Sequence, residues 1–298
     1  MDSWGGFIIG FRAAVGGQRL SPHDSAQAVQ EFITGPVGLG IAIVMSQAVF
    51  LGAALFGVRR LPSSLKRDRL GLRRPGVPVT AYPVLVLGSV FVAALGNVLA
   101  GATRGVSISG FDADALHRQL TWTTGVWFLL AVTLPPGFAE EMLFRGYIQR
   151  RLLRRWRAGW AILFTSVTFA IVHLEPVQVV FALPVGLWLG IVAWRAGSIW
   201  PSVVCHAFIN LSMNLGRICA LHLNASRATL AEVGVGIFAA GLVGFLASLV
   251  LLRRMRPPAI PVEDDGETAP GPALAAVVAR PLDGTSPTGP SSSLTDAD

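Results

Sequence analysis

The chain has 298 residues, of which 52% are hydrophobic and only 14% are charged, and its mean hydropathy is +0.58. Soluble domains carry about 25% charged residues, so this composition excludes an ordinary soluble protein and predicts a membrane protein whose partner is the lipid bilayer. The net charge of +7 does not indicate a nucleic-acid partner, because the basic residues stand in short clusters beside apolar stretches, where membrane topology accounts for them.

The apolar stretches, taken in chain order, predict an all-α, polytopic membrane protein. A spanning helix needs roughly 20 mostly apolar residues. Seven stretches meet or approach that length: 35–58, 79–101, 121–149, 158–174, 177–195, 198–216 and 230–252. Residues 4–17 are also apolar, but the stretch is short and carries Arg12, so an interfacial helix is favoured over an eighth span. We therefore expect seven to eight transmembrane helices.

The third stretch contains two adjacent prolines, in Leu134-Pro135-Pro136-Gly137. A proline removes a backbone donor and clashes with the preceding turn of a helix. We therefore expect the helix to kink or break just before Glu140 and to open a cavity there.

Three regions are expected along the chain: an N-terminal interfacial segment (1–34), a transmembrane domain (35–256) and a C-terminal tail (257–298). The tail is rich in Pro, Gly, Ser, Thr and acid and has no hydrophobic period, which predicts disorder. Clusters of Arg and Lys follow the first, third, fifth and seventh stretches. With seven spans these clusters fall on one side, which the positive-inside rule makes cytoplasmic. The sequence thus predicts a multi-pass protein of the cell membrane with its tail in the cytoplasm and its N-terminus outside.

Two carboxylates and a guanidinium stand close together in the third stretch, at Glu140, Glu141 and Arg145. A charge near the bilayer midplane costs about 2.5 to 3.5 kcal/mol, so such a cluster indicates a function. Glu141 and Arg145 are four residues apart and share a helix face, whereas Glu140 is rotated by about 100° and shares its face with Phe144. We expect Arg145 to neutralise Glu141 and Glu140 to face the cavity. The alternative is a helix-stabilising pair with a spare carboxylate.

Two later stretches add His173, and His206 with Asn210. Each of these alone is explained by a helix-end histidine or by a hydrogen bond between helices. At 1.5 Å per residue, however, Glu140, His206 and His173 lie roughly 15, 12 and 22 Å from the basic ends of their stretches, so tilted helices could bring them together. We therefore expect one polar site in the middle of the membrane.

Such a site suits hydrolysis. A desolvated carboxylate is a competent general base toward water, and an imidazole with a carboxamide can donate to the oxyanion of a tetrahedral intermediate. Alternatively, Glu140, His173 and His206 could hold Zn²⁺ with a water as the fourth ligand. No HExxH motif is present, and the residue pattern leaves both possibilities open.

The three polar segments resemble the motifs of the CaaX protease and bacteriocin-processing (CPBP, or Abi) family of intramembrane endopeptidases. Glu140 to Arg145 resembles the family's EExxxR motif, Phe169 to His173 its FxxxH motif and His206 to Asn210 its HxxxN motif, in family order. The resemblance covers roughly residues 120–215 and implies a helical bundle with the catalytic residues in its core. It implies a peptide or membrane-protein substrate, although nothing in the chain identifies a prenylated one.

The resemblance also implies roles for individual residues. Glu140 would be the base that activates water, with His173 assisting, and His206 and Asn210 would form the oxyanion site. Glu141 with Arg145 would support the helix. The family's residues fit both a zinc enzyme and a metal-free one; we favour the metal-free mechanism and assign no cofactor, with Zn²⁺ as the alternative.

Two other classes of function compete with a protease. In a non-catalytic immunity or scaffold protein the same residues would only hold the bundle together. In a proton-coupled transporter they would relay protons. The transporter is disfavoured because the polar residues cluster at one site and the sequence shows no internal repeat.

Overall fold

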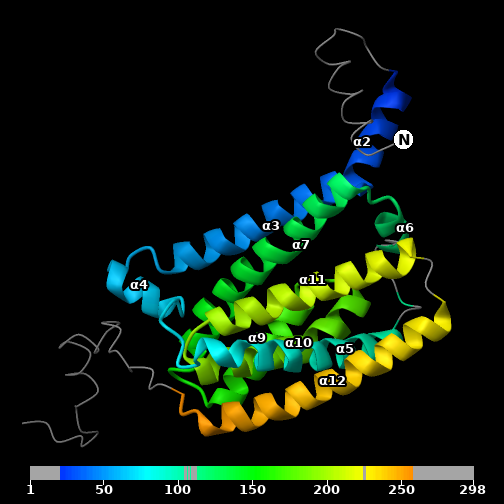
Figure 1. The fold of residues 1–298 in the computed structure, drawn as a ribbon. Coiled ribbons are helices and arrows are strands. Elements are labelled where there is room, and N and C mark those ends of the chain that lie inside the picture. Colours follow the sequence, from blue (N-terminus) through cyan, green and yellow to red (C-terminus); the bar gives the residue numbers. More distant parts are fainter. Residues whose placement is uncertain (1–20, 104–105, 107, 109–112, 224–225, 258–298) are drawn as a thin grey trace, which may run out of the picture. The chain divides into compact units, whose positions relative to one another are not determined.

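The computed structural model of the protein describes residues 21–103, 106, 108, 113–223 and 226–257. Every regular element among these residues is helical (Figure 1). The helices are, in chain order, α2 (Pro22–Thr34), α3 (Pro36–Gly57), α4 (Ser63–Arg69), η1 (Val79–Ala81), α5 (Tyr82–Gly101), α6 (Ala113–Arg118), α7 (Trp122–Glu141), η2 (Met142–Gln149), α8 (Arg150–Leu152), α9 (Ala158–Ile171), α10 (Pro176–Ala196), α11 (Trp200–His222) and α12 (Arg227–Arg254). The predicted all-α class is confirmed.

Six helical segments in the described part of the chain are long and apolar enough to cross a membrane: 36–57, 79–101, 122–152, 176–196, 200–222 and 228–254. They match six of the seven predicted stretches, so the protein is a multi-pass membrane protein. The seventh, 158–174, forms only the 14-residue helix α9. Residues 4–17 and 258–298, on which the predicted interfacial helix and nearly all of the predicted tail fall, lie outside the described residues.

The segments that follow α3, η2, α10 and α12 meet at one end of the helices, which we call the basic end. Arg150 joins two of them, because its Nη2 donates to Asp68 Oδ1 at 2.8 Å and its Nη1 to the carbonyl of Gly197 at 3.2 Å. Arg195 Nη1 donates to the carbonyl of Met255 at 3.0 Å and so adds the end of α12. The basic clusters therefore lie at one end of the helices even though α9 is short.

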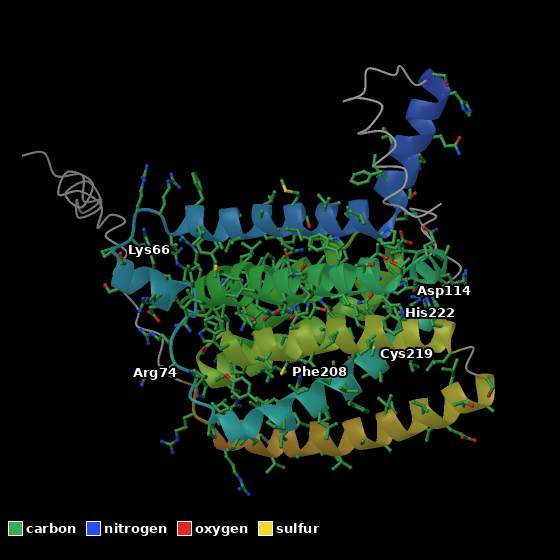
Figure 2. The ribbon with its side chains drawn as sticks, turned by 45° about the horizontal axis from the view of Figure 1, so that its top comes forward. Lys66, Arg74, Asp114, Phe208, Cys219 and His222 are labelled. Carbon is green, nitrogen blue, oxygen red and sulfur yellow. The ribbon has the colours of Figure 1, made fainter. Side chains whose placement is uncertain are left out.

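The two ends of the helices differ in the residues they carry. Figure 2 shows Lys66 and Arg74 at the basic end, and Asp114 and His222 at the opposite end. This separation agrees with the charge pattern from which the topology was predicted.

The helix formed by α7 and η2 lies between the other elements. It packs against α3, α9, α10 and α11, while α5 packs against α10, α11 and α12 (Figure 1). The largest apolar cluster forms where α5, α10, α11 and α12 meet; its fully buried members include Leu85, Leu189 and Leu252. The outer faces of α3 and α12 carry exposed apolar side chains such as Val49 and Val243, as expected for helices that face lipid.

Helix α7 begins with a capping box, in which the side chains of Thr121 and Thr124 each accept the backbone N–H of the other. The predicted break at Pro135 and Pro136 is wrong: α7 continues through both prolines to Glu141. Beyond that residue the chain widens into the π-helix η2 without leaving the helical state. The loss of backbone bonds at the prolines is partly compensated by a neighbouring side chain, Asn210, whose amide donates to the carbonyl of Val132.

Candidate active site

Glu141 accepts two hydrogen bonds on the same oxygen. Arg145 Nη1 donates to Glu141 Oε1 at 2.8 Å, and His206 Nδ1 lies 3.0 Å from that atom. All three side chains are buried. The predicted pair of Glu141 and Arg145 is therefore present, and Glu141 also orients the imidazole of His206, which the sequence did not indicate.

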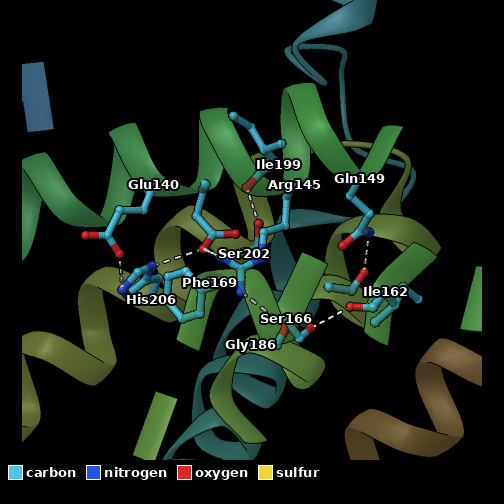
Figure 3. Close-up of polar contacts among 12 residues, drawn as sticks. Glu140, Arg145, Gln149, Ile162, Ser166, Phe169, Gly186, Ile199, Ser202 and His206 are labelled. Carbon is cyan, nitrogen blue, oxygen red and sulfur yellow. Dashed lines mark hydrogen bonds and ion pairs between the residues drawn. The ribbon is translucent and has the colours of Figure 1, made fainter. Parts of the chain in front are cut away.

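Glu140 points to different partners, as the 100° rotation between adjacent helical residues requires. Its Oε1 accepts from Gln47 Nε2 on α3 at 2.9 Å, and its Oε2 lies 3.8 Å from His206 Nε2. His206 thus lies between the two glutamates, with one ring nitrogen toward each; Figure 3 shows its ring facing Glu140. Because Nδ1 bonds to Glu141, Nε2 is the nitrogen available for chemistry.

The electrostatic balance of this group depends on His206. Glu140, Glu141 and Arg145 together carry a formal charge of −1, and a proton on His206 would make the four residues neutral. An uncompensated charge is costly in an apolar interior. The charge state of His206 therefore decides whether this buried group is neutral.

Phe169 on α9 contacts both histidines and the arginine. Its ring centroid lies 5.1 Å from that of His173 and 5.8 Å from that of His206, both edge to face. The guanidinium carbon of Arg145 lies 4.2 Å from the same centroid. His173 is half-buried, and its Nδ1 lies 2.9 Å from the carbonyl of Phe169. The structure therefore brings His173 to the edge of the group through Phe169, with its Nε2 as the remaining nitrogen.

Asn210 follows His206 by one turn of α11. Its Nδ2 donates to the carbonyl of Val132 on α7 at 3.1 Å. In a regular helix that carbonyl accepts from the residue four positions later, which here is Pro136 and has no N–H. Asn210 thus satisfies a carbonyl that the proline leaves free, and one amide proton remains for another acceptor.

A row of polar side chains extends from Arg145 toward the basic end and contacts α10. Arg145 Nη2 donates to the carbonyl of Gly186 at 3.2 Å, and Gln149 Nε2 to that of Gly190 at 2.9 Å. A Cβ at Gly190 would lie 2.9 Å from Gln149 Oε1, so a glycine is required for this close approach. A small cavity lies beside the row and is lined in part by Arg145, Gln149 and Arg150.

Polar contacts also continue from Asn210 toward the opposite end of α11. Asn214 Nδ2 donates to the carbonyl of Asn210 at 2.8 Å, and Asn214 Oδ1 lies 3.1 Å from Nε2 of the buried His117 on α6. Arg217 Nε then donates to Asp114 at 2.6 Å. One face of α11 is therefore polar from the buried His206 to the exposed Arg217.

Gln47, Gln149 and His117 were not identified from the sequence. A polar residue within an apolar stretch was the available signal for Gln47, and the four-residue spacing from Arg145 was the signal for Gln149. His117 stands in a polar segment before α7, where nothing in the pattern separates it from an ordinary surface histidine.

The possible zinc ligands Glu140, His173 and His206 do not form a metal site in this arrangement. Among the described residues, no three His, Cys, Asp or Glu side chains are grouped so that they could hold a metal ion. The ring of Phe169 packs against both imidazoles instead. The donor atoms as placed do not fit tetrahedral zinc, which needs them at about 2.0 to 2.2 Å from one point.

Comparison with known protein families gives a match to part of the chain. The model of a family described as type II CAAX prenyl endopeptidase Rce1-like matches residues 121–212. The matched stretch is less than half of the chain and contains all three polar motifs, from α7 to the first half of α11. No curated protein and no solved structure is significantly similar to the chain. Residues 121–212 are therefore Rce1-like, which confirms the family predicted from the three motifs.

Proposed function

We propose that the protein is an intramembrane endopeptidase that hydrolyses a peptide bond of a membrane-associated peptide or protein, with water activated by Glu140. The observation that carries this proposal is the placement of His206. Its Nδ1 is bound to Glu141, and its Nε2 lies 3.8 Å from Glu140 Oε2. A base and an imidazole thus face the same small space, inside a segment that matches a protease family.

Glu140 acts as the general base. A water beside the gap, about 2.8 Å from both Glu140 Oε2 and His206 Nε2, would be in hydrogen-bonding range of each. Glu140 takes one proton from this water as its oxygen forms a bond to the carbonyl carbon of the substrate. The same carboxyl group then gives that proton to the leaving amine as the C–N bond breaks, so that the glutamate is regenerated.

His206 and Asn210 act on the oxyanion. With Nδ1–H bound to Glu141, Nε2 carries a proton only in the imidazolium form, which can then donate to the oxygen that becomes negative. Asn210 contributes its second amide proton while the first stays on Val132. His173 assists from the edge of the site through Nε2, because its Nδ1 bonds to a backbone carbonyl.

The orientation of the protein in the membrane is inferred from the basic end of its helices. The positive-inside rule makes this end cytoplasmic, so α12 delivers the C-terminal tail to the cytoplasm. The protein would then lie in the cell membrane. A substrate would reach Glu140 within the bilayer, and the similarity to type II CAAX prenyl endopeptidases makes a prenylated CAAX peptide the first one to test.

The test uses the full chain in liposomes with three internally quenched peptides: a farnesylated CAAX peptide, its unprenylated form and a transmembrane peptide. Cleavage is followed by fluorescence, and incorporation of ¹⁸O from labelled water into the new carboxyl group identifies hydrolysis. The site variant is Glu140→Gln, and its matched control is Glu232→Gln, which changes an exposed glutamate of α12.

We expect E140Q to lose at least about 100-fold in kcat, the lower range of general-base contributions, and E232Q to match the wild type. Cleavage by E140Q at the wild-type rate would refute Glu140 as the base. If neither the wild type nor any variant cleaved a peptide while all were correctly inserted, a non-catalytic scaffold would be the better assignment.

A further inference from the structure

Gln47 is an unusual residue for its position. Helix α3 crosses the membrane region with only two polar side chains, Ser46 and Gln47. Ser46 is exposed and donates to a carbonyl of its own helix, which explains it locally. Gln47 is only 6% exposed and donates to the carboxylate of Glu140 on α7. Gln47 also makes a longer local contact, in which its Nε2 donates to Oγ of Ser46 at 3.4 Å, but its shorter bond, of 2.9 Å, goes to another helix.

The cost of Gln47 indicates that its contact has a purpose. Burying an amide with an unmatched hydrogen-bonding atom is unfavourable, and Gln47 Oε1 is buried without a hydrogen-bond partner among the described residues. An apolar side chain would pack at this position without that cost. The benefit must lie in the one bond that the amide makes to another helix, and that bond goes to Glu140.

The bond constrains the carboxylate of Glu140. With Oε1 held by Gln47 at 2.9 Å, rotation about the last side-chain bond is restricted and Oε2 stays on the side of His206. A carboxylate without this donor would have two equivalent oxygens and a wider range of orientations. A misplacement of about 1 Å in a reacting group can lower a rate by roughly 100-fold.

We propose that Gln47 is a positioning residue that holds the general base Glu140 in its reactive orientation. The inference rests on the proposed function and adds to it a residue of α3, outside the segment that matches the protease family. It predicts that the contact affects catalysis through Glu140, and not only the packing of α3 on α7.

The chain offers a closely matched control in Gln149. This residue is also a buried glutamine, 1% exposed, whose Nε2 donates a bond of 2.9 Å, here to the carbonyl of Gly190, and whose Oε1 has no hydrogen-bond partner among the described residues. Gln47→Met and Gln149→Met therefore remove the same type of bond and retain similar side-chain volumes. They differ in whether the lost partner is the carboxylate of Glu140 or a backbone carbonyl.

The kinetic experiment measures kcat and KM in liposomes for whichever of the three peptides the wild type cleaves. We expect Q47M to lower kcat about 10- to 100-fold with KM within about threefold of the wild type. This is the effect expected when the base loses its orientation and substrate binding is unchanged. Q149M should lower the melting temperature by a similar amount and keep kcat near the wild-type value. Equal kcat values for Q47M and Q149M would overturn the inference while leaving Glu140 as the base.

A double-mutant cycle shows whether Gln47 acts through Glu140. If it does, adding Q47M to E140Q should not lower the residual rate further, whereas independent effects would multiply. The same cycle in thermal unfolding needs no substrate, but it uses Glu140→Ala, because E140Q retains an oxygen that can accept from Gln47: Q47M and E140A should be non-additive, and Q47M and Q149M additive. Additive effects of Q47M and E140A on unfolding would refute the contact itself, whether or not a substrate is found.

Discussion

His206 Nδ1 and Glu141 Oε1 lie 3.0 Å apart, across the contact between α11 and α7. Through this contact Glu141 orients the imidazole of His206, in addition to pairing with Arg145. Glu141 fixes which nitrogen of His206 faces Glu140, much as a carboxylate orients the histidine of a hydrolytic triad. The adjacent glutamates thus make different contacts because they point in different directions.

Glu141→Gln should destabilise the protein strongly. The variant leaves Arg145, which is 1% exposed, without its charged partner, and breaking one side of a buried pair costs about 3–5 kcal/mol. Thermal unfolding in detergent micelles would measure the loss. E140Q is the control, because Gln47 can still donate to the amide oxygen that replaces the carboxylate. A melting temperature of E141Q equal to that of the wild type would show that the pair does not stabilise the fold.

Asn210→Ala should destabilise the protein less when Pro136 is also replaced by alanine. In the single variant the carbonyl of Val132 loses its donor, whereas an alanine at position 136 would supply a backbone N–H to the same carbonyl. Unfolding measurements on N210A, P136A and the double variant test this coupling. Activity then separates the two roles of Asn210. If it donates to the oxyanion, the double variant stays slow; a double variant with wild-type kcat would leave Asn210 a purely structural role.

Gly146→Ala should be destabilising although alanine is the better helix former. A Cβ at this position would lie 2.4 Å from the backbone oxygen of Leu70, which cannot move aside as a flexible side chain could. Such overpacking costs about 1–3 kcal/mol. Gly52→Ala is the matched control, because nothing lies within 4 Å of its Cβ, and it should be neutral or stabilising by up to about 1 kcal/mol. Equal melting temperatures for the two variants would contradict the close contact.

The pair of Asp114 and Arg217 should make a small, acid-sensitive contribution to stability. The hydrogen bond from Arg217 lowers the pKa of Asp114 below its ordinary value of 3.8. The stabilisation is therefore present above about pH 4 and is lost as the pH falls through the lower pKa of the folded state. Both side chains are nearly half exposed, so the effect is no more than about 1 kcal/mol. The difference in melting temperature between wild type and D114N should shrink from about pH 6 to about pH 3; a constant difference would contradict it.

Purified protein should contain far less than one zinc per chain, and a chelator should leave hydrolysis unchanged. The reason is the placement of Phe169 against both His173 and His206, which keeps the imidazoles from a shared ion, together with the carboxamide at Asn210, a poor zinc ligand. Elemental analysis and chelator titration measure both quantities. Near-stoichiometric zinc, lost with activity and restored by added metal, would replace the metal-free mechanism with a zinc-assisted one.

The sequence was sufficient for the features that depend on local periodicity. The six long apolar helices follow from the length needed to cross a bilayer, and the separate directions of Glu140 and Glu141 follow from the helical angle. The length of α9 was overestimated because Val172 and Leu174 are apolar. In the structure α9 ends at Ile171, and Leu174, with a φ of 62°, lies in the turn that leads to Pro176 at the start of α10.

Features that depend on contacts between distant segments could not be predicted. Gln47 meets Glu140 across 93 positions in the chain, and the π-helix η2 has no residue type that signals it. The effect of the prolines was also misjudged. The two prolines were expected to kink or break the helix, but the fold supplies Asn210 to the carbonyl that Pro136 leaves free, and α7 does not break.

The short length of α9 has a consequence for the surrounding lipid. Its 14 residues rise about 21 Å, roughly 9 Å less than the hydrocarbon core of a bilayer. Exposed apolar side chains such as Phe164 and Ile171 show that α9 faces lipid. A bilayer that matches the hydrophobic length of α9 would be thinner beside this helix and would leave the polar turn at Glu175 in water. Such a dip in the membrane surface would shorten the distance that water travels to His173, and lipid deformation would thereby supply water to the proposed reaction.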